Sequence, residues 1–494
     1  MKKLIILFLV IGLTSCDDFL KENVRGIISP NNFYNSDPEA IQAANGLYVT
    51  YRENVYRNWE GISAWQYFGT DEIMPSRIFG GLAAIMDYNL TETNYGNAYG
   101  MWQDLYRVVG DANSVILNLQ DNVKISEAVK NRSLGEAYFL RALAYHNLTS
   151  IWGDVPFYTE DLTLAEVGEL GRTDKSQIRT AMIADLKTAE GLLPSSYTGS
   201  NIGRASKWAA KFLRTRLHLW LQEWPAALDA SKDIIDNSPH RLLPTYGEIF
   251  DVNNQFNEEA IFGWDHLTGV QGQAITDSFN PRLRDEPKNS SQRGEFAGVL
   301  SSRGEEFNGF GLAVPLNDAV EKHPDDLRKS WNMMDTYLGY DLTYTYLRKR
   351  TNFDFVQSPR GNHGEWWITM RMGQVYLMAA EAANEIGDPS AYNYINTIRD
   401  RAYEEDANLA SLSQVEFRRA VQDELKWELL GETERKYDLV RWGIFYETVK
   451  NANYGRFSGP NNIQPHMQYA PIPAEEIVLN PALLDSDPTN NGYR

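Results

Sequence analysis

The amino-acid sequence predicts an all-α protein: a superhelix of tetratricopeptide-like helical hairpins with long loop-rich insertions and little β-structure. Three observations lead to this fold class. Apolar residues recur at intervals of three and four between residues 366 and 402, a similar pattern recurs between residues 209 and 235, and two long stretches lack any such period. Intervals of three and four residues place side chains on one face of an α-helix.

The stretch from residue 366 to residue 402 contains the clearest hairpin. Its first half carries one apolar helical face, formed by Ile368, Met372, Val375, Ala379, Ala382 and Ile386. Gly387-Asp388-Pro389 follows: glycine suits the left-handed end of a helix, aspartate caps the next helix, and proline fits its first turn. A second apolar face then runs to Ala402. We therefore expect two antiparallel helices joined by a tight turn.

A second hairpin has the same layout. Residues 209–221 predict its first helix, Trp224-Pro225 its turn and residues 227–235 its second helix. Three positions match between the hairpins at one constant offset: Pro225, Ala227 and Ile234 correspond to Pro389, Ala391 and Ile398. Small residues near a turn let paired helices approach closely, as in tetratricopeptide repeats, which stack helix pairs into a superhelix.

Further helices follow from the same spacing. They are expected within residues 36–55, 102–119, 134–151, 178–193 and 413–431. Ser413 and Glu416 form a capping box at the start of the last one. Alternating residues between Thr343 and Leu347 indicate a short strand.

Two stretches lose the helical period, at about residues 59–100 and 242–365. The second is long for a connection within a compact domain, which favours a functional role or a small subdomain. We therefore expect one domain, residues 16–494, whose helical core carries two ligand-binding insertions.

Composition excludes one class of partner. The chain has 494 residues and a formal net charge of -19, and after its first three residues it has no basic run longer than three residues. Nucleic-acid binding needs a cationic surface, so we expect no nucleic-acid partner.

The N-terminus predicts export and lipidation. Lys2 and Lys3 precede an apolar run that is too short to span a bilayer but suits a signal peptide. Leu13-Thr14-Ser15-Cys16 then resembles a bacterial lipobox, which would remove residues 1–15 and leave Cys16 lipidated. An ordinary signal peptide or a buried helix is the alternative. Because Cys16 is the single cysteine, disulfides and cysteine metal sites are excluded.

One charged block invites an enzymatic interpretation. Glu428 and Glu432 lie one helical turn apart, close in sequence to Arg435, Asp438 and Arg441. A carboxylate pair for glycoside hydrolysis needs separation across a substrate, usually from different elements. We therefore interpret the block as an ion-pair network.

Metal and cofactor motifs are missing from the sequence. Asp485, Asp487 and Asn490 suggest a calcium loop, but Pro488 and the lack of a ligand at the twelfth position contradict it. The seven histidines lack zinc-protease spacing, and no phosphate-binding or nucleophile-elbow motif occurs. We expect no catalytic residues, no metal and no cofactor.

Aromatic residues in the two insertions are the candidate ligand contacts. A planar ring can stack on the apolar face of a sugar while polar groups bond its hydroxyls. The candidates are Trp65, Tyr67, Tyr88, Trp264, Phe310 and Trp331, with Asp71 as a polar partner. For any one ring, core packing is the alternative.

Several blocks of residues, in this order, resemble one protein family. They are Arg141-Ala142-Leu143-Ala144-Tyr145, Trp152-Gly153-Asp154-Val155-Pro156, Ala380-Glu381-Ala382, Asp438-Leu439-Val440-Arg441-Trp442-Gly443, Pro471-Ile472-Pro473 and Asn491-Gly492-Tyr493. With the lipobox, they resemble the SusD/RagB family of outer-membrane nutrient-binding lipoproteins from end to end. The chain differs from the family's pattern only at its C-terminal motif. The family's usual Gln-Asn-Pro-Gly-Tyr is replaced here by Thr489-Asn490-Asn491-Gly492-Tyr493.

The resemblance implies a function and a partner. It implies ligand-binding loops on one face of the superhelix and a TonB-dependent, SusC-like barrel in the outer membrane, which the lipoprotein covers as a lid. We therefore expect a surface-exposed lipoprotein that binds nutrient, an oligosaccharide, and delivers it to that barrel. The alternatives are a protein-binding tetratricopeptide scaffold, a peptide-capturing family member and a glycoside hydrolase.

Overall fold

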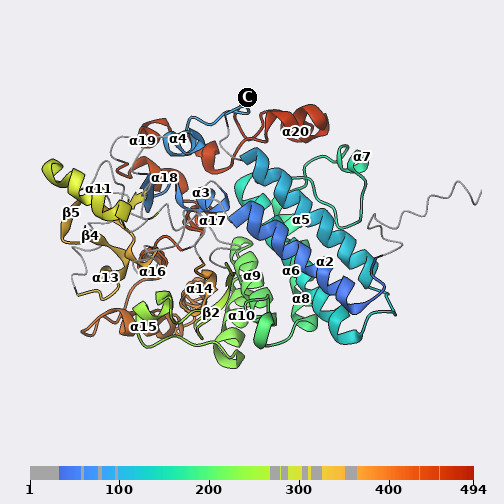
Figure 1. Cartoon of the computed structure of the whole chain (residues 1–494), viewed down its shortest axis with the longest axis horizontal. Helices are drawn as coiled ribbons and strands as arrows, with labels where there is room; N and C mark the ends of the chain where they lie inside the picture. The colour runs from blue at the N-terminus through green and yellow to red at the C-terminus, as the bar shows by residue number, and fades with distance from the viewer. Residues whose placement is uncertain are drawn as a thin grey trace, which may run out of the picture.

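The computed structural model describes most of the chain after residue 32. The described ranges are 33–56, 61–75, 80–94, 98–266, 279, 287–302, 310–312, 325–350, 364–432, 434–454 and 457–494. They are mostly helical, and their helices pair into antiparallel hairpins, which confirms the all-α tetratricopeptide-like fold class (Figure 1). Cys16 and the expected signal peptide lie outside these ranges.

The N-terminal half forms one continuous helical layer. It consists of α2 (Asp37–Thr50), which continues as a π-helical turn, η2 (Tyr51–Tyr56), and of α5 (Ala98–Leu119), α6 (Glu127–Ile151) and α8 (Lys175–Leu192). α6 packs against α2, α5 and α8, and its buried face includes nearly every residue after Arg132. The small residues Ala137 and Ala144 on α6 are fully buried, as close helix packing requires.

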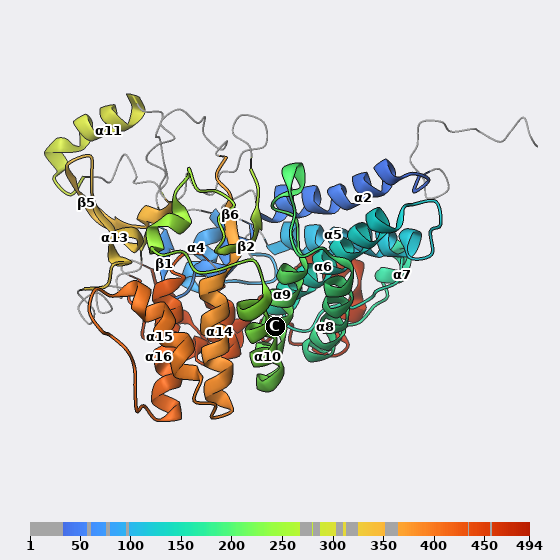
Figure 2. The ribbon, with the colours of Figure 1, turned by 90° about the horizontal axis from the view of Figure 1, so that it is seen from below.

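Both predicted hairpins are present. The first is α9 (Lys207–Trp220) with α10 (Trp224–Asn237), and the second is α14 (Met372–Glu385) with α15 (Ala391–Ala402). α10 packs against α14, so hairpins far apart in the sequence lie side by side (Figure 2). α16 (Gln414–Glu428) packs on the other side of α14 and begins with the capping box predicted at Ser413 and Glu416.

One predicted boundary was wrong. The helix expected from Ile368 begins at Met372, because residues 367–371 form the strand β6 (Trp367–Arg371). β6 pairs antiparallel with β2 (Ala260–Trp264), and Trp367 lies opposite Trp264. A spacing of four residues keeps two side chains on one face of either a strand or a helix, so Ile368 and Met372 fitted both.

The described residues contain three small antiparallel sheets of two strands each. Beside β2–β6, β1 (Ile73–Pro75) pairs with β3 (Phe310–Leu312), and β4 (Met334–Tyr337) pairs with β5 (Tyr340–Tyr346). β5 confirms the strand predicted near residues 343–347. The β1–β3 pair joins the two stretches that the sequence marked as insertions.

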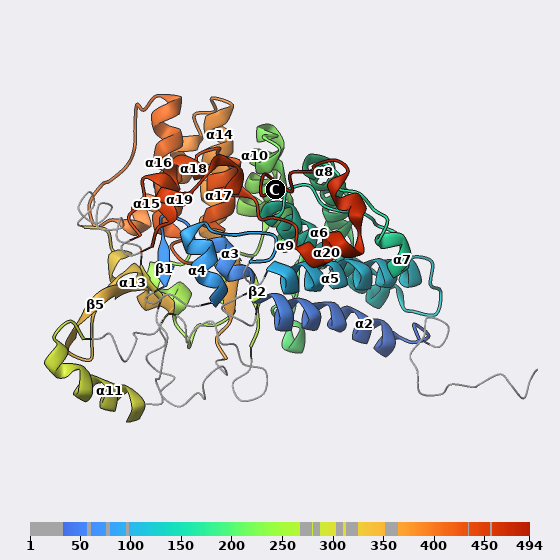
Figure 3. The same cartoon turned by 90° about the horizontal axis from the view of Figure 1, so that it is seen from above.

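Short helices complete the molecule. They are α3 (Ile62–Tyr67), α4 (Gly80–Asp87), α7 (Leu164–Val167), α11 (Arg293–Ser302), α13 (Lys329–Asn332), α17 (Arg435–Arg441), α18 (Phe445–Lys450), α19 (Gly459–Asn462) and α20 (Ala474–Leu479). The C-terminal segment returns to the N-terminal layer, where the amide of Ala470 donates to the carbonyl of Ile151 at 2.7 Å (Figure 3). No helix in the described ranges is long and apolar enough to cross a membrane.

Candidate functional site

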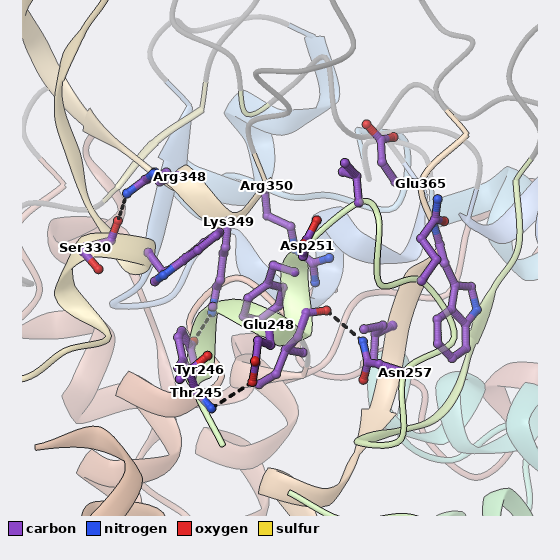
Figure 4. Close-up of a pocket in the computed structure, with 18 of the residues that line it drawn as sticks. Thr245, Tyr246, Glu248, Asp251, Asn257, Ser330, Arg348, Lys349, Arg350 and Glu365 are labelled. Carbon is purple, nitrogen blue, oxygen red and sulfur yellow. Dashed lines mark hydrogen bonds between the residues drawn. The ribbon is translucent and has the colours of Figure 1, made fainter. Parts of the chain in front are cut away.

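A pocket of about 710 Å³ opens where irregular segments meet above the helical hairpins (Figure 4). Its walls come from the 3-10 turn η4 (Tyr246–Phe250) and the residues after it, from α13, from the 3-10 turn η8 (Arg348–Arg350), and from the start of β6. These segments are distant in sequence. The residues after η4 lead into β2, and the β2–β6 pairing brings them next to the start of β6.

Trp331 on α13 forms one aromatic wall. Its ring is half-buried and lies 6.5 Å, centroid to centroid, from the ring of Phe250. Gly247 makes this position possible, because a Cβ atom there would lie 2.4 Å from Trp331 Cε2. The indole therefore lies flat against η4 and leaves part of its surface open to the pocket.

Trp366 and Trp367 form a second aromatic wall at the start of β6. Trp366 is 8% exposed and stacks on Phe256 at 4.5 Å. Gly263 on the neighbouring strand permits this packing, since a Cβ atom there would lie 2.8 Å from Trp366 Nε1. Trp367 lies deeper and stacks under the guanidinium of Arg350 at 3.8 Å.

Two of the three consecutive cations of η8 differ sharply in their surroundings. Arg348 is exposed, donates from Nη1 to the carbonyl of Ser330 at 3.0 Å, and lies 5.0 Å above the Trp331 ring. Lys349 is buried and donates to Glu432 Oε1 at 2.6 Å and to the Tyr246 hydroxyl at 2.7 Å. Burial lowers the pKa of Lys349 to about 8, against the attraction of Glu432.

An ion-pair network lies beneath the pocket and confirms the structural interpretation of Glu428 and Glu432. Arg371 is its hub: its guanidinium donates to Glu428 Oε1 at 2.6 Å, to Glu432 Oε2 at 2.6 Å and to Glu259 Oε1 at 2.8 Å. Burial opposes ionisation of Glu428, but Arg401 and Arg371 lower its pKa to about 2. Both carboxylates are therefore bound by cations.

Four of the seven predicted ligand contacts lie in the core. Trp65, Tyr67 and Tyr88 are each 1–2% exposed, and so is Trp264. Trp264 stacks on Tyr51 at 4.8 Å. The Tyr67 hydroxyl donates to the carbonyl of Glu432 at 3.2 Å. These surroundings favour packing roles for the four rings.

Asp71 is also enclosed. It accepts two bonds of 2.9 Å from the guanidinium of Arg435 and one of 2.8 Å from Lys426. Burial opposes its ionisation, yet Arg435 and Lys426 hold the pKa of Asp71 well below its usual range. Of the remaining two predicted contacts, Trp331 lines the pocket, and Phe310 lies on β3, where the structure describes only the backbone.

The sequence did not single out Trp366, Trp367 or the η8 cations as pocket residues. Trp366 and Trp367 stand just before Ile368, where the apolar face of the expected helix begins, so the helical spacing indicated no role for them. The signal for η8 was its run of three consecutive basic residues, which is unusual in a chain with a net charge of -19. Among the described residues, no group of three His, Cys, Asp or Glu side chains is arranged to hold a metal ion.

Comparisons with known proteins cover the whole chain. A family described as "SusD family" matches residues 316–493, and one described as "Starch-binding associating with outer membrane" matches residues 31–219. The SusD-like protein P25 of Formosa agariphila is 40% identical, with 99% of each chain covered. The SusD-like protein P2 of the same organism is 26% identical, with 100% of each chain covered.

Solved structures share the fold at lower identity. A laminarin-binding SusD-like protein is 24% identical with a TM-score of 0.72, and the match covers 90% of this chain and 97% of that one. Surface glycan-binding protein A of Bacteroides thetaiotaomicron, solved with laminarihexaose, is 18% identical with a TM-score of 0.73 and coverage of 92% and 100%.

Proposed function

We propose, from the premise that this chain belongs to the SusD family, that it binds an oligosaccharide without cleaving it and delivers the sugar to an outer-membrane transporter. The observation that carries the proposal is the pocket whose walls include Trp331 and Trp366. An aromatic wall can stack on the apolar face of a sugar ring, and polar side chains beside it can form hydrogen bonds with the sugar's hydroxyl groups.

The expected affinity is modest. A fully buried aromatic side chain removes roughly 150–250 Å² from water, and a sugar covers about one face, which leaves about 2 kcal/mol per ring at ~25 cal/mol per Å². Association costs several kcal/mol. Two rings therefore give weak binding, which suits capture followed by transfer.

Among the predicted ligand residues, we propose Trp331 as the direct contact. Phe310, in the same insertion, remains a candidate. Trp65, Tyr67, Asp71 and Tyr88 are proposed to support the site from the core. Trp264 supports it most directly, because it lies opposite Trp367 in the β2–β6 pair.

Three further parts of the proposal concern location and partner. Residues 1–15 are removed as a signal peptide, Cys16 is lipidated, and residues 16–494 form a single domain at the cell surface. A TonB-dependent, SusC-like barrel receives the sugar, and this protein acts as its lid. Changing Cys16 to Ser should release the protein from the membrane fraction and abolish co-purification of the barrel; continued membrane attachment would contradict lipidation.

Calorimetry with a panel of oligosaccharides, including laminarihexaose and maltohexaose, tests the binding. The Trp331→Ala variant should bind the best ligand about 10- to 100-fold more weakly, because one stacking ring is lost. Trp224→Ala, at the turn of the first hairpin, serves as the matched control and should bind as the unmodified protein does.

Other results would point to the alternatives. Peptide binding with no response to any glycan favours a peptide-capturing protein. Equal binding by the Trp331→Ala variant removes this pocket as the site. Cleavage of a labelled oligosaccharide by the purified protein would indicate a hydrolase.

A further inference from the structure

The ion-pair network beneath the pocket is electrically balanced. Its ion pairs, all between described residues, connect five cationic and five anionic side chains: Arg328, Lys349, Arg371, Arg399 and Arg401 with Glu259, Asp326, Glu424, Glu428 and Glu432. All ten side chains are at most 8% exposed. Every charge in the network therefore has an opposite charge within the network.

Arg350 is a cation of the pocket that lies outside this network of described residues. It lines the pocket, is 8% exposed, and has no carboxylate within ion-pair distance among the described residues. Its Nε donates to the carbonyl of Gly431 at 3.2 Å, and its Nη2 is buried without a hydrogen-bond partner in the described part of the chain. The nearby Glu432 is already held by Lys349 and Arg371. An unpaired buried guanidinium is costly, and an anion beside it would reduce that cost.

Arg348 adds a second unpaired cation at the rim of the same pocket. One of its nitrogens donates to the Ser330 carbonyl, and its Cζ lies 5.0 Å from the centroid of the Trp331 ring, so two contacts hold the guanidinium at this position. Among the described residues, no carboxylate pairs with it. Its remaining N–H groups can donate to an oxyanion in the pocket, and charge-assisted bonds of this kind are about twice as strong as neutral ones.

The pocket also contains acidic side chains. Glu248 and Asp251 are exposed at the rim and accept from nearby backbone amides, those of Thr245 and Asn253 respectively. Glu365 is partly exposed. Water and salt screen exposed charges, whereas the charge of Arg350 acts from inside the wall, where the effective dielectric constant is lower. The acidic residues therefore weaken the attraction for an anion less than their number suggests.

We propose that this pocket takes an anionic oligosaccharide, in which a carboxylate or sulfate group on the sugar lies between Arg348 and Arg350. Arg348 donates hydrogen bonds to the group, Arg350 attracts it from the wall, and Trp331 stacks on the ring that carries it. This inference rests on the proposed function, whose pocket it uses.

Matched pairs of ligands test the inference by calorimetry. Alginate oligosaccharides carry carboxylates, and their carboxyl-reduced products keep the same linkages without charge. Sulfated carrageenan oligosaccharides and their desulfated products form the second pair. In at least one pair, the charged member should bind about 10- to 100-fold more tightly, and its affinity should fall as salt rises. The pair that shows the difference identifies the anion.

Two variants locate the effect. Arg348→Gln and Arg350→Gln should each weaken binding of the charged ligand about 10-fold more than binding of its neutral product. Arg348 is exposed, so its variant tests the inference even if Arg350→Gln fails to fold. Arg348→Lys, which keeps the charge but loses the fork of donors, should retain part of the affinity.

The outcomes separate the two proposals. If neutral oligosaccharides bind as tightly as charged ones, or if both variants lose charged and neutral ligands equally, the anionic preference is wrong and the proposed function stands. If the folded protein binds no saccharide of either kind, the proposed function itself fails.

Discussion

Trp264 and Trp331 come from the same loop-rich stretch but have opposite environments. Trp264 is 2% exposed and stacks on Tyr51 of the N-terminal helical layer. Trp331 is half-buried, with its ring against the glycine of η4 and Arg348 above it. The difference teaches that the segment packed against a ring, rather than the loop that carries it, decides whether the ring supports the core or lines a pocket.

Removing the buried ring should have the largest effect. Trp264→Ala leaves a cavity between β2 and η2, so we expect the free energy of unfolding to fall by about 3–5 kcal/mol. Urea titration followed by circular dichroism measures it. A loss below about 1 kcal/mol would mean that Trp264 is not part of the core, and the comparison with Trp331 would fail.

The second prediction concerns Glu72, which lies next to Asp71 in the core. Burial raises the pKa of Glu72 to about 8, although Arg435 opposes the shift. In the unfolded chain this carboxyl ionises near its usual value of 4.5, so its contribution to stability is present at low pH and is lost as the pH rises from about 4.5 through 8. Glu72→Gln removes this loss, because glutamine stays neutral.

We therefore expect Glu72→Gln to be more stable than the unmodified protein by about 1–3 kcal/mol at pH 9 and equally stable near pH 4. Thermal unfolding across this pH range is the measurement. The exposed Glu404→Gln variant should follow the unmodified protein at every pH. If Glu72→Gln is less stable at pH 9, the carboxylate is needed as an anion in the folded state.

The third prediction, with the smallest expected effect, tests whether Trp331 needs its position against η4 to bind a ligand. In Gly247→Ala the new Cβ would overlap the Trp331 ring, which must turn away from η4. Affinity for the best saccharide should fall about 10-fold, which corresponds to about 1.4 kcal/mol, while stability changes by no more than about 1 kcal/mol.

Gly46→Ala is the control for this substitution. Gly46 lies on the exposed side of α2 with no atom within 4 Å of an added Cβ. Alanine should stabilise the helix by about 0.5–1 kcal/mol and leave affinity unchanged. Unchanged affinity in Gly247→Ala as well would show that Trp331 does not need its position against η4.

Local patterns in the sequence predicted the helical hairpins well. Both hairpins, the capping box at Ser413 and the strand near residue 343 depend on neighbours within a few residues, and the sequence displays such relations directly. The ion pairing of Glu428 was also predicted. Its partner Arg371, 57 residues away, was not, because periodicity carries no information about which elements meet.

The pocket could be predicted only in part. Trp331 was named, but Trp366 and Arg350 were not, because these three residues meet only after the β2–β6 and η4–η8 packing has formed. The burial of Trp65 and Trp264 likewise depends on helices that are distant in sequence. A list of loop aromatics therefore mixes wall residues with core residues until the tertiary partners are known.

β6 passes directly into α14: Trp367 stands at one end of the strand, and Arg371 at the other caps the helix. The pocket wall at Trp367 is thus continuous with the first helix of the second hairpin, with no loop between them. Under the proposed function, binding of a sugar should therefore require little ordering of this wall.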